Sequence, residues 1–475
     1  MRFLMNMAVW GSVILSAATG RGAEPEGFSC QMLTLPVKDA ALSFADLDGR
    51  GRCDLLALDP LADRLLIYRQ RADGFTNTPD QSLALPPQTA WVAPYRTVAN
   101  GVTELVVSTA AGLAVFQQSN GVFAAEPQPL VRTSQVFTNH DWASLISLDT
   151  NGAIPVISAT QAWSYRQKEA SAWTSGPPVT LESGHSSWTG FATAWSMGLN
   201  SSYHLEARAS FSATTNEAAE EKSDHDVLER YLAELGKTGQ TPRITRLDLN
   251  RDGQTDLILW HLTGDLEDKT DIYVFLRGAD GKLPPQPTQT LHCRGFPFPA
   301  GPALEPTPVA DLKGDGTYEL VLLEPRFATT SLSSLADMLV SRGVDLALTI
   351  RPFARGAFAG RAEASVPLTV MLSWFGTGQW PFFIRGDFNG DGRPDLLVQR
   401  SATTWVVFGS TNDGHWFDPR PAMKLELPTQ GYVPRRVFQI SDLNGDGRAD
   451  VVMRDPDDPR VFIFLTQPSS RKGNP

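Results

Sequence analysis

A nine-residue acidic pattern recurs along the chain and limits the folds that are available to it. Three copies align without gaps, and a short apolar run follows each copy directly. The three copies are Asp248-Leu-Asn-Arg-Asp-Gly-Gln-Thr-Asp256, Asp387-Phe-Asn-Gly-Asp-Gly-Arg-Pro-Asp395 and Asp442-Leu-Asn-Gly-Asp-Gly-Arg-Ala-Asp450. A unit repeated at intervals of about 50 residues is typical of propellers and solenoids, in which each unit completes its core against its neighbours.

Further copies of the pattern have lost one or more carboxylates. The copy at 311–319 has Lys313 at its third position, and the copy at 46–54 has Arg50 at its fifth. Two fainter copies, at 100–104 and 149–152, keep the pattern and lose most of the carboxylates. Together the copies define units that start near residues 46, 96, 147, 248, 311, 387 and 442.

A second signal completes most of the units. Asp-Gly or Asn-Gly follows the acidic pattern between apolar runs, at Asp73, Asn120, Asp280 and Asp413. These dipeptides favour hairpin turns, because glycine reaches positive φ without steric cost. Each unit therefore predicts four short strands, the composition of a propeller blade. We predict an all-β fold, a seven-bladed β-propeller of four-stranded blades. A degenerate eighth blade between residues 147 and 248 is the alternative.

Two of the intervals are too long for one blade. The first predicts an insertion at about 182–242, where residues 224–237 repeat apolar residues at helical spacing. The second predicts a helical insertion at about 328–345. The last unit stops after three strands, and residues 30–36 resemble the fourth strand of other units. We therefore expect residues 30–36 to close the last blade, and residues 24–475 to form a single propeller domain.

Residues 1–23 have the pattern of an export signal. Arg2 precedes an apolar run that ends near Ala18, and small residues follow it. The run is short for a membrane span, and no other stretch approaches ~18 apolar residues. We expect a secreted or periplasmic monomer without a membrane span, with an uncleaved anchor as the alternative. The net charge of −11 argues against nucleic-acid binding, which needs a basic surface.

The acidic pattern has the spacing of a cation-binding loop. Oxygen-bearing side chains stand at positions 1, 3, 5 and 9, and glycine at position 6 allows the loop to turn sharply. Alternate residues of such a loop point inward together, and Ca²⁺ takes about six to eight oxygen ligands. The pattern lacks His and Cys, which disfavours zinc and copper, and Mg²⁺ requires a stricter octahedron. We therefore expect about three Ca²⁺ ions, one for each intact copy.

The predicted ligands in each intact loop are the side chains at positions 1, 3, 5 and 9 and the carbonyl at position 7. They are Asp248, Asn250, Asp252, Gln254, Asp256, Asp387, Asn389, Asp391, Arg393, Asp395, Asp442, Asn444, Asp446, Arg448 and Asp450. The helix–loop–helix calcium motif is excluded, because it needs Glu at position 12, where Leu259, Val398 and Met453 stand. A solvated acidic turn without metal is the alternative.

The degenerate loops are weaker metal candidates. Lys313 and Arg50 put a positive charge where a ligand oxygen is required, so we expect little or no calcium in these two loops. Lys313 would stand in for the charge of the metal. The weaker candidates are Asp311, Asp315, Glu319, Asp46, Asp48 and Asp54. The copies that start near 96 and 147 are expected to bind none.

The repeated motif resembles the FG-GAP and VCBS repeats. The shared residues are Asp-x-Asn-x-Asp-Gly-x-x-Asp after a strand, and the resemblance covers about residues 30–466 without the two insertions. The chain is similar in this respect to the N-terminal propeller of integrin α-subunits, whose calcium loops lie in the later blades. This resemblance implies a propeller with calcium loops. The degraded loops of the first three units and Lys313 depart from the pattern, and no ligand specificity carries over.

The motifs of common catalytic sites are missing from the sequence. It contains no His-Glu-x-x-His, Cys-x-x-Cys, Gly-x-Ser-x-Gly or phosphate loop. We predict a binding module for a protein or carbohydrate (glycan) ligand rather than an enzyme. The alternatives are a polysaccharide lyase or glycoside hydrolase on a propeller scaffold, and an envelope scaffold protein.

Tryptophans supply the candidate contacts for such a ligand. Aromatic rings stack on sugars or anchor protein partners, although packing in the core is the alternative. The candidates are Trp163, Trp173, Trp188 and Trp195. Cys30 and Cys53 are a possible disulfide pair in an exported protein, which leaves Cys293 unpaired.

Overall fold

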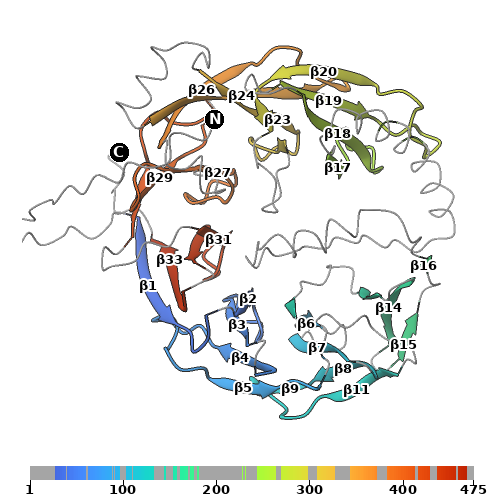
Figure 1. The fold of residues 1–475 in the computed structure, drawn as a ribbon, viewed down its shortest axis with the longest axis vertical. Helices are drawn as coiled ribbons and strands as arrows, with labels where there is room; N and C mark the ends of the chain where they lie inside the picture. Colours follow the sequence, from blue (N-terminus) through green and yellow to red (C-terminus); the bar gives the residue numbers. More distant parts are fainter. Residues whose placement is uncertain are drawn as a thin grey trace, which may run out of the picture.

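The chain forms β-sheets that follow one another around a ring, as the computed structural model shows (Figure 1). The structure describes residues 27–38, 40–59, 62–87, 89, 91–96, 103–109, 111–132, 144–145, 153–157, 161–169, 172–175, 179–180, 227, 231, 243–263, 269–297, 308–326, 343–371, 382–411, 416–427, 436–455 and 458–467. Within these residues the sheets have four to six strands each, apart from one small hairpin. The predicted all-β propeller is confirmed, and the number of blades stays a prediction.

The first part of the ring contains three sheets and the hairpin. One sheet consists of β2 (Ala41–Ala45), β3 (Asp54–Asp59), β4 (Arg64–Tyr68) and β5 (Gln81–Ala84). The next consists of β6 (Trp91–Arg96), β7 (Thr103–Thr109), β8 (Gly112–Phe116), β11 (Gln128–Arg132) and β12 (Ser144–Leu145). The hairpin is β9 (Gln118–Ser119) with β10 (Val122–Phe123). The third sheet consists of β13 (Ala153–Ile157), β14 (Gln161–Glu169), β15 (Ala172–Ser175) and β16 (Val179–Thr180).

The second part of the ring contains the remaining sheets. One consists of β17 (Arg243–Leu247), β18 (Asp256–Thr263), β19 (Lys269–Phe275) and β20 (Gln289–Arg294). The six-stranded sheet consists of β21 (Phe296–Pro297), β22 (Val309–Ala310), β23 (Glu319–Pro325), β24 (Gly343–Ala354), β25 (Ala357–Phe358) and β26 (Ala364–Met371). It is followed by β27 (Phe382–Ile384), β28 (Leu396–Gln399), β29 (Thr404–Phe408) and β30 (Met423–Glu426).

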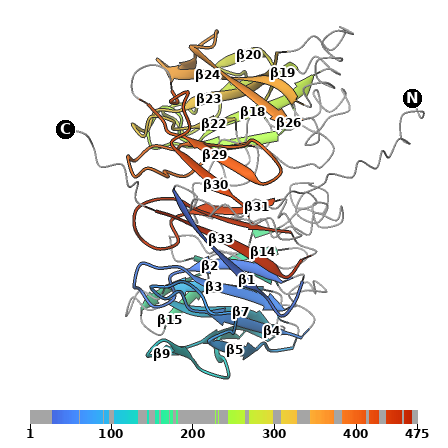
Figure 2. The same ribbon diagram turned by 90° about the vertical axis from the view of Figure 1, so that its left-hand side faces the viewer.

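The last sheet joins the two ends of the described chain. Its strands are β31 (Arg436–Ser441), β32 (Asp450–Arg454), β33 (Arg460–Thr466) and β1 (Phe28–Thr34). β1 runs antiparallel to β33 over its whole length, with Phe28 opposite Thr466 and Thr34 opposite Arg460. Seen from the side, this sheet lies between β2–β5 and β27–β30 (Figure 2). β1 therefore covers the edge of β33 that would otherwise be free to pair with another chain.

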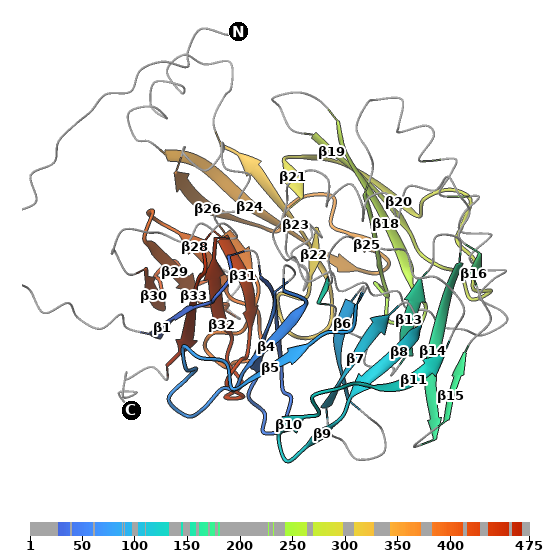
Figure 3. The same ribbon diagram turned by 60° about the horizontal axis from the view of Figure 1, so that its bottom comes forward.

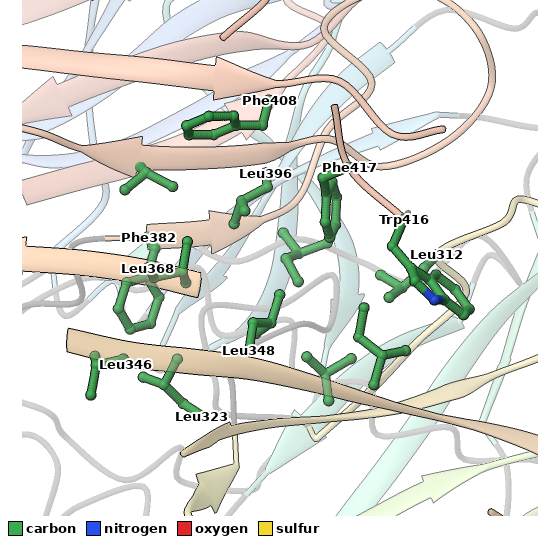
Figure 4. Close-up of a cluster of buried hydrophobic side chains, with 14 of the residues drawn as sticks. Leu312, Leu323, Leu346, Leu348, Leu368, Phe382, Leu396, Phe408, Trp416 and Phe417 are labelled. Atoms are coloured by element: carbon green, nitrogen blue, oxygen red, sulfur yellow. The ribbon is translucent and has the colours of Figure 1, made fainter. Parts of the chain in front are cut away.

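The core lies between consecutive sheets. Leu323, Leu346 and Leu348 of the six-stranded sheet pack toward Phe382 and Phe408 of the following sheet (Figure 4). Because each inner strand is covered on both faces, it is a continuous apolar run and does not alternate with polar residues. All residues of β3 and of β32 are buried, for example. The apolar run after each acidic pattern is therefore the second strand of a sheet, held between two neighbours.

The described part of the predicted 224–237 helix is helical and packs on a sheet. Val227 and Tyr231 lie one helical turn apart, and Val227 is buried against Leu257 and Leu259 of β18. The Tyr231 ring meets Phe275 edge-on, with 5.2 Å between the ring centroids. Residues 1–26 and 327–342 lie outside the described residues, and with them the predicted export signal and most of the 328–345 insertion. Among the described residues, no helix is long and apolar enough to cross a membrane.

Three glutamines tie neighbouring sheets together at the outer rim of the ring. Gln81 of β5 donates a hydrogen bond from Nε2 to Phe123 O (2.6 Å) and accepts one from Phe123 N at Oε1 (2.9 Å). Figures 1 and 3 show β5 beside the β9–β10 hairpin that carries Phe123. Gln289 makes the same pair of bonds with Phe358, and Gln31 makes it with Phe75. Each of these phenylalanines is buried and follows the hairpin turn of the next sheet.

Removal of one glutamine bridge should weaken the contact between two sheets. We expect Gln289→Ala to lower the free energy of unfolding by about 1–3 kcal/mol, because two hydrogen bonds of about 0.5–1.5 kcal/mol each are lost. Unfolding in urea, followed by tryptophan fluorescence, measures this change. Thr290→Ala is the matched control, since Thr290 is the exposed neighbour on the same strand. Equal urea midpoints for the two variants would contradict a bridging role.

Candidate metal centre

Five acidic loops share one backbone conformation. Each loop links two paired strands of a sheet, and the loops are residues 46–54, 248–256, 311–319, 387–395 and 442–450. Position 6 is glycine in all five, with φ between 75° at Gly316 and 85° at Gly392. Position 4 is also left-handed, and Arg251 adopts this conformation at φ 61° where the other loops have glycine. The degenerate loops therefore make the same turn as the intact ones.

The carboxylate at position 1 holds this turn together. Asp442 accepts hydrogen bonds from the amides of positions 4, 5 and 6 at 2.7, 3.2 and 2.8 Å. Asp46 accepts the same three amides at 2.8, 3.1 and 2.9 Å, although Arg50 occupies position 5 of its loop. The shape of the turn is therefore independent of a carboxylate at position 5.

The carboxylate at position 9 fastens the loop to the sheet. Asp395 accepts the amide of Phe388 at position 2 (2.9 Å) and the amide of Ser410, which follows β29 (2.8 Å). Asp450 and Asp256 make equivalent pairs of bonds, to Leu443 and Thr466 and to Leu249 and Arg277. All three carboxylates have zero exposed surface. Each one therefore links the loop to the end of the third strand.

Burial changes the proton affinity of these carboxylates. Loss of solvation raises the pKa of Asp395 and of Asp450 to about 7, although the two amide hydrogen bonds oppose the shift. Burial likewise raises the pKa of Asp256 and of Asp54. In Asp54 the charge is also met by Arg69, whose Nη1 lies 2.6 Å from Asp54 Oδ2. A nearby positive charge is therefore one way to hold position 9 ionised.

Positions 3 and 5 distinguish the loops from one another. In the loops 248–256 and 442–450, the Asn at position 3 donates its side-chain amide to the Asp at position 5, at 2.9 and 3.2 Å. In the loop 387–395 the partner of Asp391 is Arg393, with Nη2 2.6 Å from Oδ2. In the loop 46–54, Arg50 itself occupies position 5 and forms an ion pair with Asp48. Two loops thus carry an arginine on a carboxylate that would bind a cation.

The loop 311–319 differs from the others because it has Lys313 at position 3. The ammonium of Lys313 lies 4.6 Å from the ring centroid of Trp416, in the following sheet. Lys313 thus makes a cation–π contact, and no ion pair with a described carboxylate is seen. Glu319 is fully buried, and its Oε1 has no hydrogen-bond partner among the described residues. Burial raises the pKa of Glu319 to about 7.

The donor chemistry of the intact loops fits a hard cation. Oxygen atoms stand at positions 1, 3 and 5, and positively charged guanidinium groups already contact Asp391 and Asp48. Among the described residues, no three His, Cys, Asp or Glu side chains are grouped in the arrangement of a metal site. Two features explain this: position 3 is Asn in the intact loops, and position 9 faces main-chain amides. The loops that start near 96 and 147 lie mostly outside the described residues.

Neighbouring loops are in direct contact. The amide of Ala449, at position 8 of its loop, donates to Asp387 O at 2.7 Å, and the amide of Cys53 donates to Leu443 O at 2.7 Å. A Cβ atom on Gly445 would lie only 2.1 Å from the carbonyl of Gly51. Arg251 extends the series, because its Nη2 donates to Asp315 O at 2.7 Å. A Cβ atom on Gly314 would lie 2.6 Å from the carbonyl of Gly392, so the five acidic loops form a connected row within the ring.

The remaining candidate residues are only partly placed. Trp163 lies in β14 and Trp173 lies in β15, which pair with each other. Trp188 and Trp195 lie outside the described residues. Cys30, Cys53 and Cys293 are all free thiols, so the structure has no Cys30–Cys53 disulfide. Burial raises the pKa of Cys30 and of Cys53 to about 11.

The buried carboxylates predict an unusual dependence of stability on pH in metal chelator. The pKa of Asp395 and of Asp450 is about 7 in the folded protein, above the ordinary value of 3.8, so the folded state binds protons more tightly than the unfolded state. Their contribution to stability is then fully present below pH 3.8 and is lost as pH rises through 7. We expect the melting temperature to rise between pH 8 and pH 5. Asp395→Asn should flatten this rise, and an equally steep rise in that variant would contradict the assignment.

Comparisons with known proteins show what this chain is similar to. No curated protein matches the sequence significantly. One similar solved structure is that of an Agrocybe aegerita lectin, described as recognising non-reducing terminal N-acetylglucosamine. Its sequence is 14% identical, the match covers 91% of this chain and 86% of the lectin chain, and the TM-score is 0.40. A structure of BBS1N in complex with ARL6DN is 10% identical, covers 93% and 94%, and has a TM-score of 0.33.

The family comparison falls on the acidic loops themselves. Residues 387–453 match the model of the FG-GAP-like repeat. This segment begins at Asp387, the first residue of one intact loop, and includes the whole of the loop 442–450. The predicted resemblance is confirmed for this segment, since residues 387–453 match the FG-GAP-like repeat.

Proposed function

We propose that the protein is an exported, calcium-binding β-propeller that serves as a binding module for a protein or glycan ligand. One observation carries the calcium part of the proposal. All five loops keep the residues that shape and fasten the turn, at positions 1, 6 and 9. Only the three intact loops also keep an oxygen donor at both position 3 and position 5. The turn forms without a donor at position 5 in the loop 46–54 and without one at position 3 in the loop 311–319, so the presence of both donors elsewhere supports a bound cation.

The proposed ligands can be named for one loop. In the loop 442–450 the ion would be held by Asp442, Asn444 and Asp446, with the carbonyl of Arg448. Ca²⁺ supplies positive charge among oxygen ligands. That charge offsets the repulsion between the carboxylates at positions 1 and 5. Asp450 would add to the site through lone pairs that its two amide hydrogen bonds leave free.

The binding role is supported by the connected row of loops. Loops carried on a rigid scaffold are common sites of recognition, because they are exposed while their ends are fixed. Here the ends of each loop are fixed by a buried carboxylate and by contacts to the next loop. Export fits this role, since extracellular calcium modules bind with Kd of about 10⁻⁴–10⁻³ M.

The calcium part is tested by removing the ion and then one loop at a time. A chelator should lower the melting temperature, because an ion that binds only the folded state stabilises it by mass action. Asp446→Ala should lower the calcium stoichiometry by about one, given one ion per loop. Asp315→Ala is the matched control, since its loop has Lys313 in place of a donor. A melting curve that the chelator leaves unchanged would contradict the proposal.

The binding part is tested separately, on a panel of immobilised glycans. We expect retention in calcium that falls on chelation, because the loops that shape the face lose their counter-ion. Asp446→Ala should weaken retention in the same direction. Retention that is indifferent to both changes would separate ligand binding from the loops. Release of shorter products from a retained glycan would instead identify an enzyme.

A further inference from the structure

The three intact loops carry the same acidic residues but differ in what faces the carboxylate at position 5. Arg393 occupies position 7 of the loop 387–395, Arg448 occupies position 7 of the loop 442–450, and Gln254 occupies position 7 of the loop 248–256. In the proposed site only the main-chain carbonyl of this residue is a ligand. The side chain at position 7 is therefore not a proposed ligand, and its effect on the carboxylate at position 5 can differ from loop to loop.

Arg393 folds back onto its own loop. Its guanidinium donates from Nη2 to Asp391 Oδ2 at 2.6 Å and from Nε to Asp391 Oδ1 at 3.3 Å. Both oxygens of the carboxylate are thus engaged by one cation, the strong geometry for an arginine–carboxylate pair. The Arg393 side chain is 15% exposed and that of Asp391 is 30% exposed, so water screens the pair only in part.

Arg393 is also held in place by the neighbouring loop. A Cβ atom on Gly314 would lie 3.2 Å from Arg393 Cγ, so Gly314 leaves the space that the side chain uses. Nη2 of Arg393 also lies 3.4 Å from Ser410 O, just after β29 of the same sheet. The side chain is therefore packed against its carboxylate partner and does not extend into solvent.

Arg448 takes a different course from the same position. A Cβ atom on Gly390 would lie 3.5 Å from Arg448 Nε, which places the side chain over the preceding loop. Within the described residues Arg448 forms no ion pair with Asp446; only its main-chain amide bonds that carboxylate, at 2.9 Å. Two loops of nearly identical sequence therefore differ at position 5: among the described residues, Asp391 has a tethered counter-ion and Asp446 has none.

We propose that Arg393 is a tethered competitor of the cation for Asp391, and that it makes the loop 387–395 the weakest of the three calcium loops. This inference rests on the proposed calcium binding. A cation that binds Asp391 must displace the guanidinium of Arg393 or share the carboxylate with it. Among the described residues, no guanidinium contacts the carboxylate of Asp446, so a cation there has no such competitor. Loss of the competitor should therefore tighten one calcium site and leave the others unchanged.

Calcium titration by calorimetry tests the competition, with two matched variants. Arg393→Gln places in this loop the residue that the loop 248–256 carries naturally, and Arg448→Gln makes the same change in the loop 442–450. We expect Arg393→Gln to tighten the weakest site by about 2- to 5-fold, as removal of a partly exposed ion pair predicts. Arg448→Gln should leave all constants within error. The gain should disappear in an Asp391→Asn background.

A second readout needs no calcium. In chelator, Arg393→Gln should lower the melting temperature, because Asp391 loses its counter-ion, and Arg448→Gln should not. Unchanged calcium constants in Arg393→Gln, or an equal gain in Arg448→Gln, would overturn the inference while wild-type binding keeps the proposed function intact. A wild-type protein that binds no calcium would overturn both.

Discussion

The buried carboxylate at position 9 of each acidic loop is the interaction on which the sheet arrangement depends. Asp395 sits at the start of a second strand and holds one amide from the loop and one from the end of the third strand. An unpaired amide in such a position costs about 1–3 kcal/mol, and Asp256, Asp395 and Asp450 each satisfy two such amides. The charge of each carboxylate is the cost of this arrangement, because the side chain has no exposed surface.

The loops differ in the groups that balance their carboxylate charges. In the loop 46–54, Arg69 pairs with Asp54 and Arg50 pairs with Asp48, so two of its carboxylates have an arginine as counter-ion. The loop 387–395 uses Arg393 on Asp391. Among the described residues, the carboxylates at position 5 of the loops 248–256 and 442–450 have only amide partners. A divalent cation would balance the same carboxylates, and in the last two loops it would not compete with a guanidinium among the described residues.

The sequence predicted the architecture well because that information is local. Asn120-Gly121 has positive φ at both residues, 52° and 80°, and forms the hairpin that the dipeptide indicates. The roles of individual oxygens were not predictable, because they depend on distant partners. The second amide on Asp450 comes from Thr466, and the glutamine bridges join residues such as Gln289 and Phe358. Position 7 is harder still, since Arg393 and Arg448 differ only in where the neighbouring loops let them lie.

Contacts between loops extend a local change to the next sheet. The carbonyl of Asp387 accepts the amide of Ala449, and the carbonyl of Leu443 accepts the amide of Cys53. These carbonyls belong to positions 1 and 2, the part of the loop that the buried carboxylate and the turn amides hold. A shift of the loop 442–450 would therefore strain bonds on both of its sides. The row continues from the loop 442–450 to the loop 46–54. Because β1 completes the sheet that carries the loop 442–450, the N-terminal strand and residues 387–453 are joined by one connected set of contacts.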